Sequence, residues 1–165
     1  MRFEFGDYQI DVDAERTKAF YASLPQISAA CTCIGCRNFV QAVADLPETV
    51  TALFDALGVD RTKPAEAYVN CANPDGTLFY QGFYHLCGRI LAGDRSQEQS
   101  ADGFFAGFRW VQLTDSFSVG FFADCDLLED GFPAPVIQLE IAAHLPWVLP
   151  EGHNYPASKK KESLI

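Results

Sequence analysis

Apolar and polar side chains alternate through the first twelve residues, a pattern typical of β-strands. The segments Phe3–Phe5 and Tyr8–Val12 flank the pair Gly6-Asp7. Glycine at the first turn position suits a type II′ turn, whose twist matches that of the strands it joins. The sequence therefore predicts a β-hairpin at the start of the chain.

The period then changes from two to between three and four residues, which indicates helices. Asp13 can cap a helix that runs to about Leu24. The apolar positions from Cys36 to Leu46 form one face of a second helix. Pro47 opens a further helix at its favoured first position, and Gly58 ends it. We expect these helices to bury one apolar stripe each.

Alternation returns from Ala65 onward. The segments Ala65–Ala72 and Thr77–Leu91 flank Asn73-Pro74-Asp75-Gly76, whose residues favour turns. With Gly76 as the left-handed residue of a three-residue loop, the register of this hairpin follows from the turn. The pairs expected are Asn73–Thr77, Cys71–Phe79 and Val69–Gln81.

Three further strands are expected near Phe108–Thr114, Phe117–Asp124 and Val136–Leu145, and the polar residues 93–103 indicate a mobile loop. Helices and strands are segregated along the chain and do not alternate. This order predicts an antiparallel α+β fold, a meander sheet with a small group of helices from the N-terminal third packed on one face. We expect a single domain over residues 1–149 and a polar C-terminal tail over residues 150–165.

Composition narrows the class of partner. The chain has 165 residues, 48% of them hydrophobic, which is enough to bury one core without a metal or disulfide staple. Its formal net charge is −10, so nucleic acids and anionic membranes are disfavoured as partners. A basic partner protein stays compatible, and an acidic inhibitor of such a protein is one alternative function.

Signals for export are absent from the N-terminus, because acidic residues stand where an apolar signal region would begin. No apolar stretch reaches transmembrane length. We therefore expect a soluble, cytoplasmic chain whose cysteines stay reduced. No glycine-rich phosphate loop is present, so no nucleotide cofactor is expected.

Three cysteines lie within six residues, at Cys31, Cys33 and Cys36. The Cys-x-x-Cys spacing, with Gly35 before its second cysteine, lets two thiolates converge on one tetrahedral ion. Cys31 can add a third ligand. The cluster predicts a zinc site, and with no recognisable catalytic constellation the favoured function is a non-enzymatic binding or interaction domain.

A complete zinc site needs a fourth ligand, and the candidates are Cys71, His85 and Cys87. On the expected register all three share one strand face. Cys71 and His85 are separated by about 20 Å along the hairpin, so they cannot bind one ion together. We favour the end of the hairpin that has two donors, His85 and Cys87. Cys87 is assigned as the fourth ligand, with His85 or Cys71 as alternatives. His153 lies in the tail and carries little information.

Two other readings of the cysteine cluster remain open. A thiol-dependent redox or nucleophilic enzyme would use Cys33 or Cys36, since Cys36 falls near a helix start, where the helix dipole lowers a thiol pKa. Alternatively, the reduced cysteines pack as small hydrophobic side chains. The sequence does not choose between them.

Overall fold

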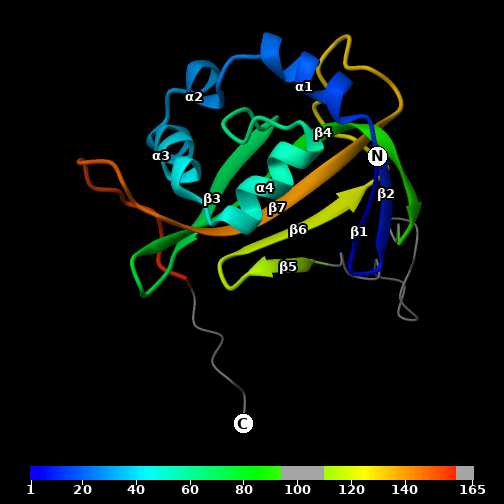
Figure 1. The fold of residues 1–165 in the computed structure, drawn as a ribbon. Coiled ribbons are helices and arrows are strands. Elements are labelled where there is room, and N and C mark those ends of the chain that lie inside the picture. Colours follow the sequence, from blue (N-terminus) through cyan, green and yellow to red (C-terminus); the bar gives the residue numbers. More distant parts are fainter. Residues whose placement is uncertain (94–109, 159–165) are drawn as a thin grey trace, which may run out of the picture.

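The computed structural model describes residues 1–93 and 110–158 of the chain. The described residues form helices and strands in the order drawn in Figure 1. The helices are α1 (Ala14–Ser23), α2 (Ile27–Ala30), α3 (Ile34–Ala42), a 3₁₀ turn (Val43–Asp45) and α4 (Glu48–Leu57). The strands are β1 (Arg2–Phe5), β2 (Tyr8–Val12), β3 (Glu66–Ala72), β4 (Thr77–Ala92), β5 (Val111–Thr114), β6 (Phe117–Phe122) and β7 (Val136–Pro146).

One antiparallel sheet of seven strands organises the molecule, in the order β1-β2-β4-β7-β6-β5 with β3 also paired to β4. Figure 1 shows the helices gathered on one face of this sheet. The fold is therefore α+β, as the segregation of helices and strands predicted. None of the helices in the described ranges has the length and apolar character that a membrane span requires.

The central strand β4 has two distinct faces. Leu78, Tyr80, Tyr84 and Leu86 point toward the helices, and each of these side chains is fully buried. The Tyr80 ring contacts Phe39 of α3, with 5.5 Å between ring centroids. We call this helix-covered side the inner face and the opposite side the outer face. Residues paired directly across neighbouring strands share a face.

Helix α1 fills a gap along the edge of β4. Strand β3 pairs with β4 up to Phe83, and β2 pairs with it from Gly88 onward. Between them, the Tyr21 hydroxyl accepts a hydrogen bond from the His85 N–H at 3.1 Å and donates to the His85 carbonyl at 3.2 Å. The Cys87 N–H donates to Thr17 Oγ1 at 3.0 Å. Side-chain hydroxyls thus satisfy the backbone groups that no strand reaches.

Most of the expected local structure is confirmed. Asp13 caps α1 by accepting from the Arg16 N–H, and Gly58 and Gly76 both adopt the left-handed conformation, with φ of 74° and 87°. The Asn73 N–H donates to the Thr77 carbonyl, which fixes the turn as expected.

Three details of the helices and strands differ from expectation. The helix expected over 36–46 begins at Ile34 and becomes a 3₁₀ turn after Ala42. Pro47 is the N-cap of α4, because its ψ of 147° is extended. The strand expected to run to Asp124 ends at Phe122.

A bulge in β3 changes the register of its hairpin. Cys71 pairs with Phe79 as expected, but Val69 pairs with Tyr80 and not with Gln81. The extra residue on β3 breaks the simple alternation of faces along this strand.

Two predicted segments lie wholly or partly outside the described residues. The loop expected over 93–103 and the start of the strand expected from Phe108 lie outside the described residues, apart from Gly93.

The first part of the expected tail makes backbone contacts. The Ala72 N–H donates to the Pro156 carbonyl, and the Ser158 N–H donates to the Ala72 carbonyl.

Candidate metal centre

The three neighbouring cysteines converge where α2 ends and α3 begins. Cys31 is the C-cap of α2, Cys33 is the N-cap of α3, and Cys36 lies in the first turn of α3. Their three sulfur atoms all lie within 4.8 Å of one another. The Cys31 and Cys33 sulfurs are 3.2 Å apart. Cys33 is exposed, Cys31 is partly exposed and Cys36 is buried.

Cys33 caps α3 with its side chain. The Cys36 N–H donates to Cys33 Sγ at 3.4 Å. The φ of −63° and ψ of 155° at Cys33 are the extended values that a helix N-cap adopts. The N-terminus of a helix favours negative charge, so an anionic metal site is compatible with this end of α3.

The thiols of Cys31 and Cys36 have opposite tendencies to ionise. Hydrogen bonding with the Cys33 backbone and with the thiols of Cys33 and Cys36 lowers the pKa of Cys31 below that of an ordinary thiol. Burial, followed by the effect of the neighbouring thiols, raises the pKa of Cys36. Cys31 therefore ionises before the buried Cys36.

Three parts of the chain hold the start of α3 in place. The Tyr80 hydroxyl on β4 donates to the Gly35 carbonyl at 3.0 Å. The Cys36 thiol points toward the Ala67 carbonyl on β3, at 3.9 Å. From the C-terminal side, the Tyr155 hydroxyl lies only 2.5 Å from where a Cβ on Gly35 would stand. A side chain at position 35 would therefore force the Tyr155 hydroxyl to move.

The geometry fits one tetrahedral ion bound by three thiolates. Zinc–sulfur bonds of about 2.3 Å place tetrahedral sulfur ligands about 3.8 Å apart. The three sulfurs already lie within 4.8 Å of one another, and the 3.2 Å separation of Cys31 and Cys33 needs to widen only slightly. Soft thiolates in this arrangement are the donors that zinc accepts in proteins.

The expected fourth ligand, Cys87, lies elsewhere in the molecule. The cluster rests on the inner face, where Cys36 contacts Ala67. Ala67 pairs with Gly82, and Cys87 lies five residues beyond that pair, about 16 Å along β4. Cys87 also pairs with Val136 on the outer-face side of the sheet. This structure therefore does not bring Cys87 to the cluster, because both strand length and side-chain direction separate them.

The two alternative fourth ligands also lie on the outer face. Cys71 pairs with Phe79, and His85 pairs with Gln138. Because of the bulge in β3, Val69 faces Gly35 on the inner face, while Cys71 stays on the outer face opposite Phe79. His85 is a satisfied buried residue, as its position in an apolar strand suggested: its Nε2 lies 3.0 Å from the Asp126 carbonyl. Burial lowers the pKa of His85, so the ring stays neutral.

Sequence reasoning missed the C-terminal segment as part of this region. Trp147, His153 and Tyr155 form a series of aromatic contacts, with ring centroids 4.9 Å and 5.7 Å apart. Tyr155 reaches Gly35 between the second and third cysteines. The sequence feature that could have predicted this packing is the placement of two aromatic rings, His153 and Tyr155, two residues apart in a mainly polar segment.

Within residues 1–93 and 110–158, Cys31, Cys33 and Cys36 form the one group of three or more potential ligands close enough to share an ion. Comparisons with protein-family models, with curated proteins and with solved structures found no significant match to this chain. The geometry of the cluster therefore carries the functional argument by itself.

Proposed function

We propose that this protein is a binding domain that holds one zinc ion through the thiolates of Cys31, Cys33 and Cys36. The observation that carries the proposal is the convergence of their three sulfurs within 4.8 Å. Cysteines used only as small hydrophobic side chains have no reason to place their sulfurs toward one point, with one of them exposed to solvent.

The surroundings of the cluster support the loss of thiol protons that metal binding requires. Cys31 has a lowered pKa, and Cys33 accepts an N–H at the start of α3. Burial raises the pKa of Cys36, and a bound cation would offset that effect. Zinc affinity should therefore rise with pH while Cys36 remains protonated in the metal-free protein.

A zinc ion at this position would order the connection between α2 and α3. Helix α2 is only four residues long and none of its residues is buried, so its own packing holds it weakly. The proposed ion ties the end of α2 to the first turn of α3. We infer that the ordered surface is what a partner protein recognises, and that the domain does not itself catalyse a reaction.

Metal analysis of the full chain, purified without chelator, tests the proposal. We expect about one zinc per chain, as a closed structural site binds one ion tightly. The triple variant C31S/C33S/C36S should lose the zinc. The matched control C71S/C125S alters two partly buried cysteines outside the cluster and should keep it. Less than about 0.2 zinc per wild-type chain would count against the site.

A further inference from the structure

The complete set of soft donors in the chain restricts the fourth ligand. The sequence contains six cysteines and three histidines. Beyond the cluster, the cysteines at 71 and 87 and the histidines at 85 and 144 belong to outer-face pairs of the sheet. Cys125 lies after β6, where its thiol points toward the Ala123 carbonyl. Only His153 belongs to a segment on the same side as the cluster.

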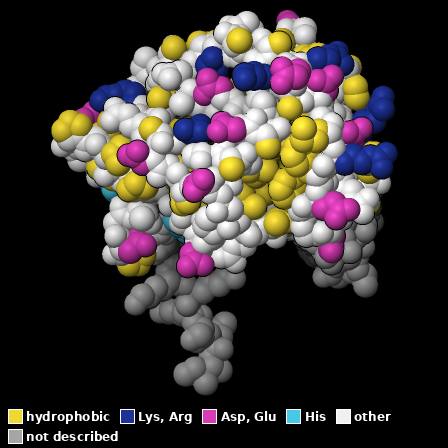
Figure 2. All heavy atoms as spheres, in the orientation of Figure 1, with side chains coloured by type: hydrophobic (Ala, Val, Ile, Leu, Met, Phe, Trp, Pro, Cys, Tyr) yellow, Lys and Arg dark blue, Asp and Glu magenta, His cyan; other side chains and the backbone are white. Residues whose placement is uncertain are grey.

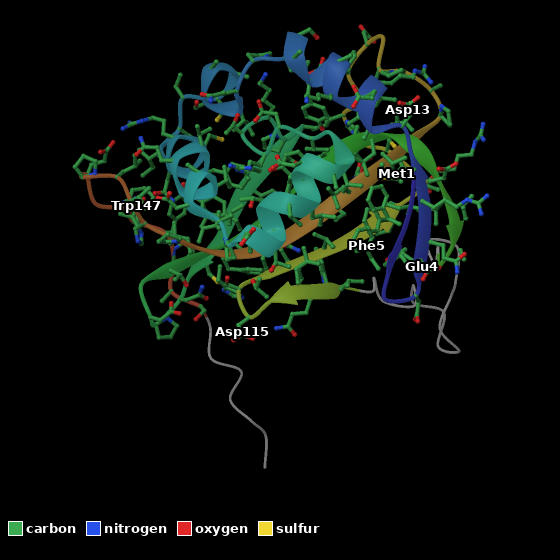
Figure 3. All side chains as sticks on the ribbon, viewed as in Figure 1. Met1, Glu4, Phe5, Asp13, Asp115 and Trp147 are labelled. Carbon is green, nitrogen blue, oxygen red and sulfur yellow. The ribbon has the colours of Figure 1, made fainter. Side chains whose placement is uncertain are left out.

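The segment that carries His153 crosses the outside of α3. The Val148 N–H donates to Asn38 Oδ1 at 2.8 Å, and Arg37 pairs with Glu151. Asn38 and Arg37 both belong to α3, and they directly follow Cys36. In Figure 3, Trp147 is labelled where this segment leaves β7 beside α3. The segment is thus anchored next to the metal-binding end of the helix.

Tyr155 connects His153 to the loop that carries the cysteines. The His153 ring contacts the Tyr155 ring, with 5.7 Å between centroids, and the Tyr155 hydroxyl lies against Gly35, between Cys33 and Cys36. His153 is not within ligand distance of the three sulfurs in this structure. The imidazole therefore reaches the cluster only if this segment moves toward it.

The His153 ring also has an unused donor atom. Its Nδ1 is buried and has no hydrogen-bond partner among the described residues. Buried ring nitrogens are normally paired, so an unpaired one calls for a partner. A metal ion held by the three thiolates is a partner that such an imidazole nitrogen can take.

We propose that His153 is the fourth zinc ligand and that metal binding draws the segment between Glu151 and Ala157 onto the cysteine cluster. This inference rests on the zinc site proposed above. The segment is fixed at Glu151 by Arg37 and at Ala157 by the bridge to Ala72, so the intervening residues carry the movement. Gly152 lies in this stretch, and glycine has more backbone conformations available than other residues.

Cobalt(II) titration of the full chain tests the assignment, because its visible spectrum reports both the number and the type of ligands. Wild-type protein should show sulfur-to-cobalt charge transfer and the intense d–d bands of a tetrahedral site with three sulfurs and one nitrogen. In H153A the charge transfer should persist, the d–d bands should shift, and cobalt affinity should fall at least about tenfold.

H144A is the matched control, since His144 lies on the outer face stacked on Phe79 and should leave the spectrum unchanged. H153C should restore a tetrahedral site with four sulfurs and stronger charge transfer. An H153A spectrum and affinity equal to wild type would overturn the role of His153 while leaving the three-thiolate site intact. No sulfur-to-cobalt charge transfer in the wild-type protein would overturn the zinc site itself.

Discussion

Cys31, Cys33 and Cys36 are close neighbours with three different surroundings. Cys31 accepts hydrogen bonds, Cys33 caps a helix and Cys36 is buried. These differences come from where each residue falls relative to α2 and α3, and the spacing of the cysteines alone does not reveal them. In the metal-free protein, these different surroundings should make the three thiols react at different rates.

In the reduced, metal-free protein, Cys31 should be the first of the three to react with iodoacetamide. Its pKa is lowered, so its thiolate persists to lower pH, whereas the raised pKa and burial of Cys36 make it the slowest. Mass spectrometry after brief alkylation across pH 6 to 9 checks the order. Cys125 is the internal control, because burial of its thiol and the nearby carboxylates raise its pKa.

The outcome also bears on the thiol-enzyme alternative. Added zinc should protect all three cysteines together. Rapid alkylation of Cys33 or Cys36 alone near pH 6.5, unaffected by zinc, would contradict this ordering and favour a nucleophilic enzyme.

The positions of the helices and strands decide which candidate ligands can reach the cysteine cluster. The turn at Gly76 and the helix ends at Asp13 and Gly58 were predictable, because local residue chemistry decides them. The bulge between Val69 and Cys71 was not, since it depends on how β3 meets the rest of the sheet. That single extra residue moves Val69 to the inner face, while Cys71 stays opposite Phe79 as predicted. Alternation placed Cys71, His85 and Cys87 on one face correctly. It could not show that the cysteine cluster lies on the other face.

The gap between β3 and β2 was equally hidden from sequence. It exists because two strands share one edge of the long strand β4, and α1 completes that edge with hydroxyl groups. We expect Tyr21→Phe to destabilise the fold by about 1–3 kcal/mol, since it leaves the N–H and carbonyl of buried His85 unpaired. Thr17→Val should act in the same direction through Cys87.

Urea denaturation compares these variants with Thr51→Val, whose hydroxyl bonds only within its own helix. The control should change the free energy of unfolding by less than about 0.5 kcal/mol. Loss of stability in Tyr21→Phe no larger than in the control would show that the α1 hydroxyls do not substitute for a strand.

Most of the hydrophobic core of the molecule lies outside the cysteine cluster. The large, fully buried side chains come mainly from β4, β6, β7 and α4, and Cys36 is the one cluster thiol that is buried. The acidic charge is not segregated on the face in Figure 2, where acidic and basic side chains are interleaved. The composition indicated a large core, and the structure has one. It could not indicate that residues near the C-terminus would lie over the cysteines.

Zinc removal should therefore loosen the protein locally. Small zinc fingers owe about 10–16 kcal/mol to their ion and unfold without it, whereas this domain has its own sheet and helices. After chelation, amide hydrogen exchange should accelerate in residues 25–40 and stay unchanged in β4 and β7. Global unfolding on chelation would show that the core depends on the metal.

X-ray absorption at the zinc edge of the loaded protein tests the central claim most directly, because it counts the atoms bound to the ion. The account predicts about three sulfur atoms at about 2.3 Å, with one nitrogen or oxygen completing a tetrahedron. A first shell of oxygen and nitrogen atoms with at most one sulfur would contradict it.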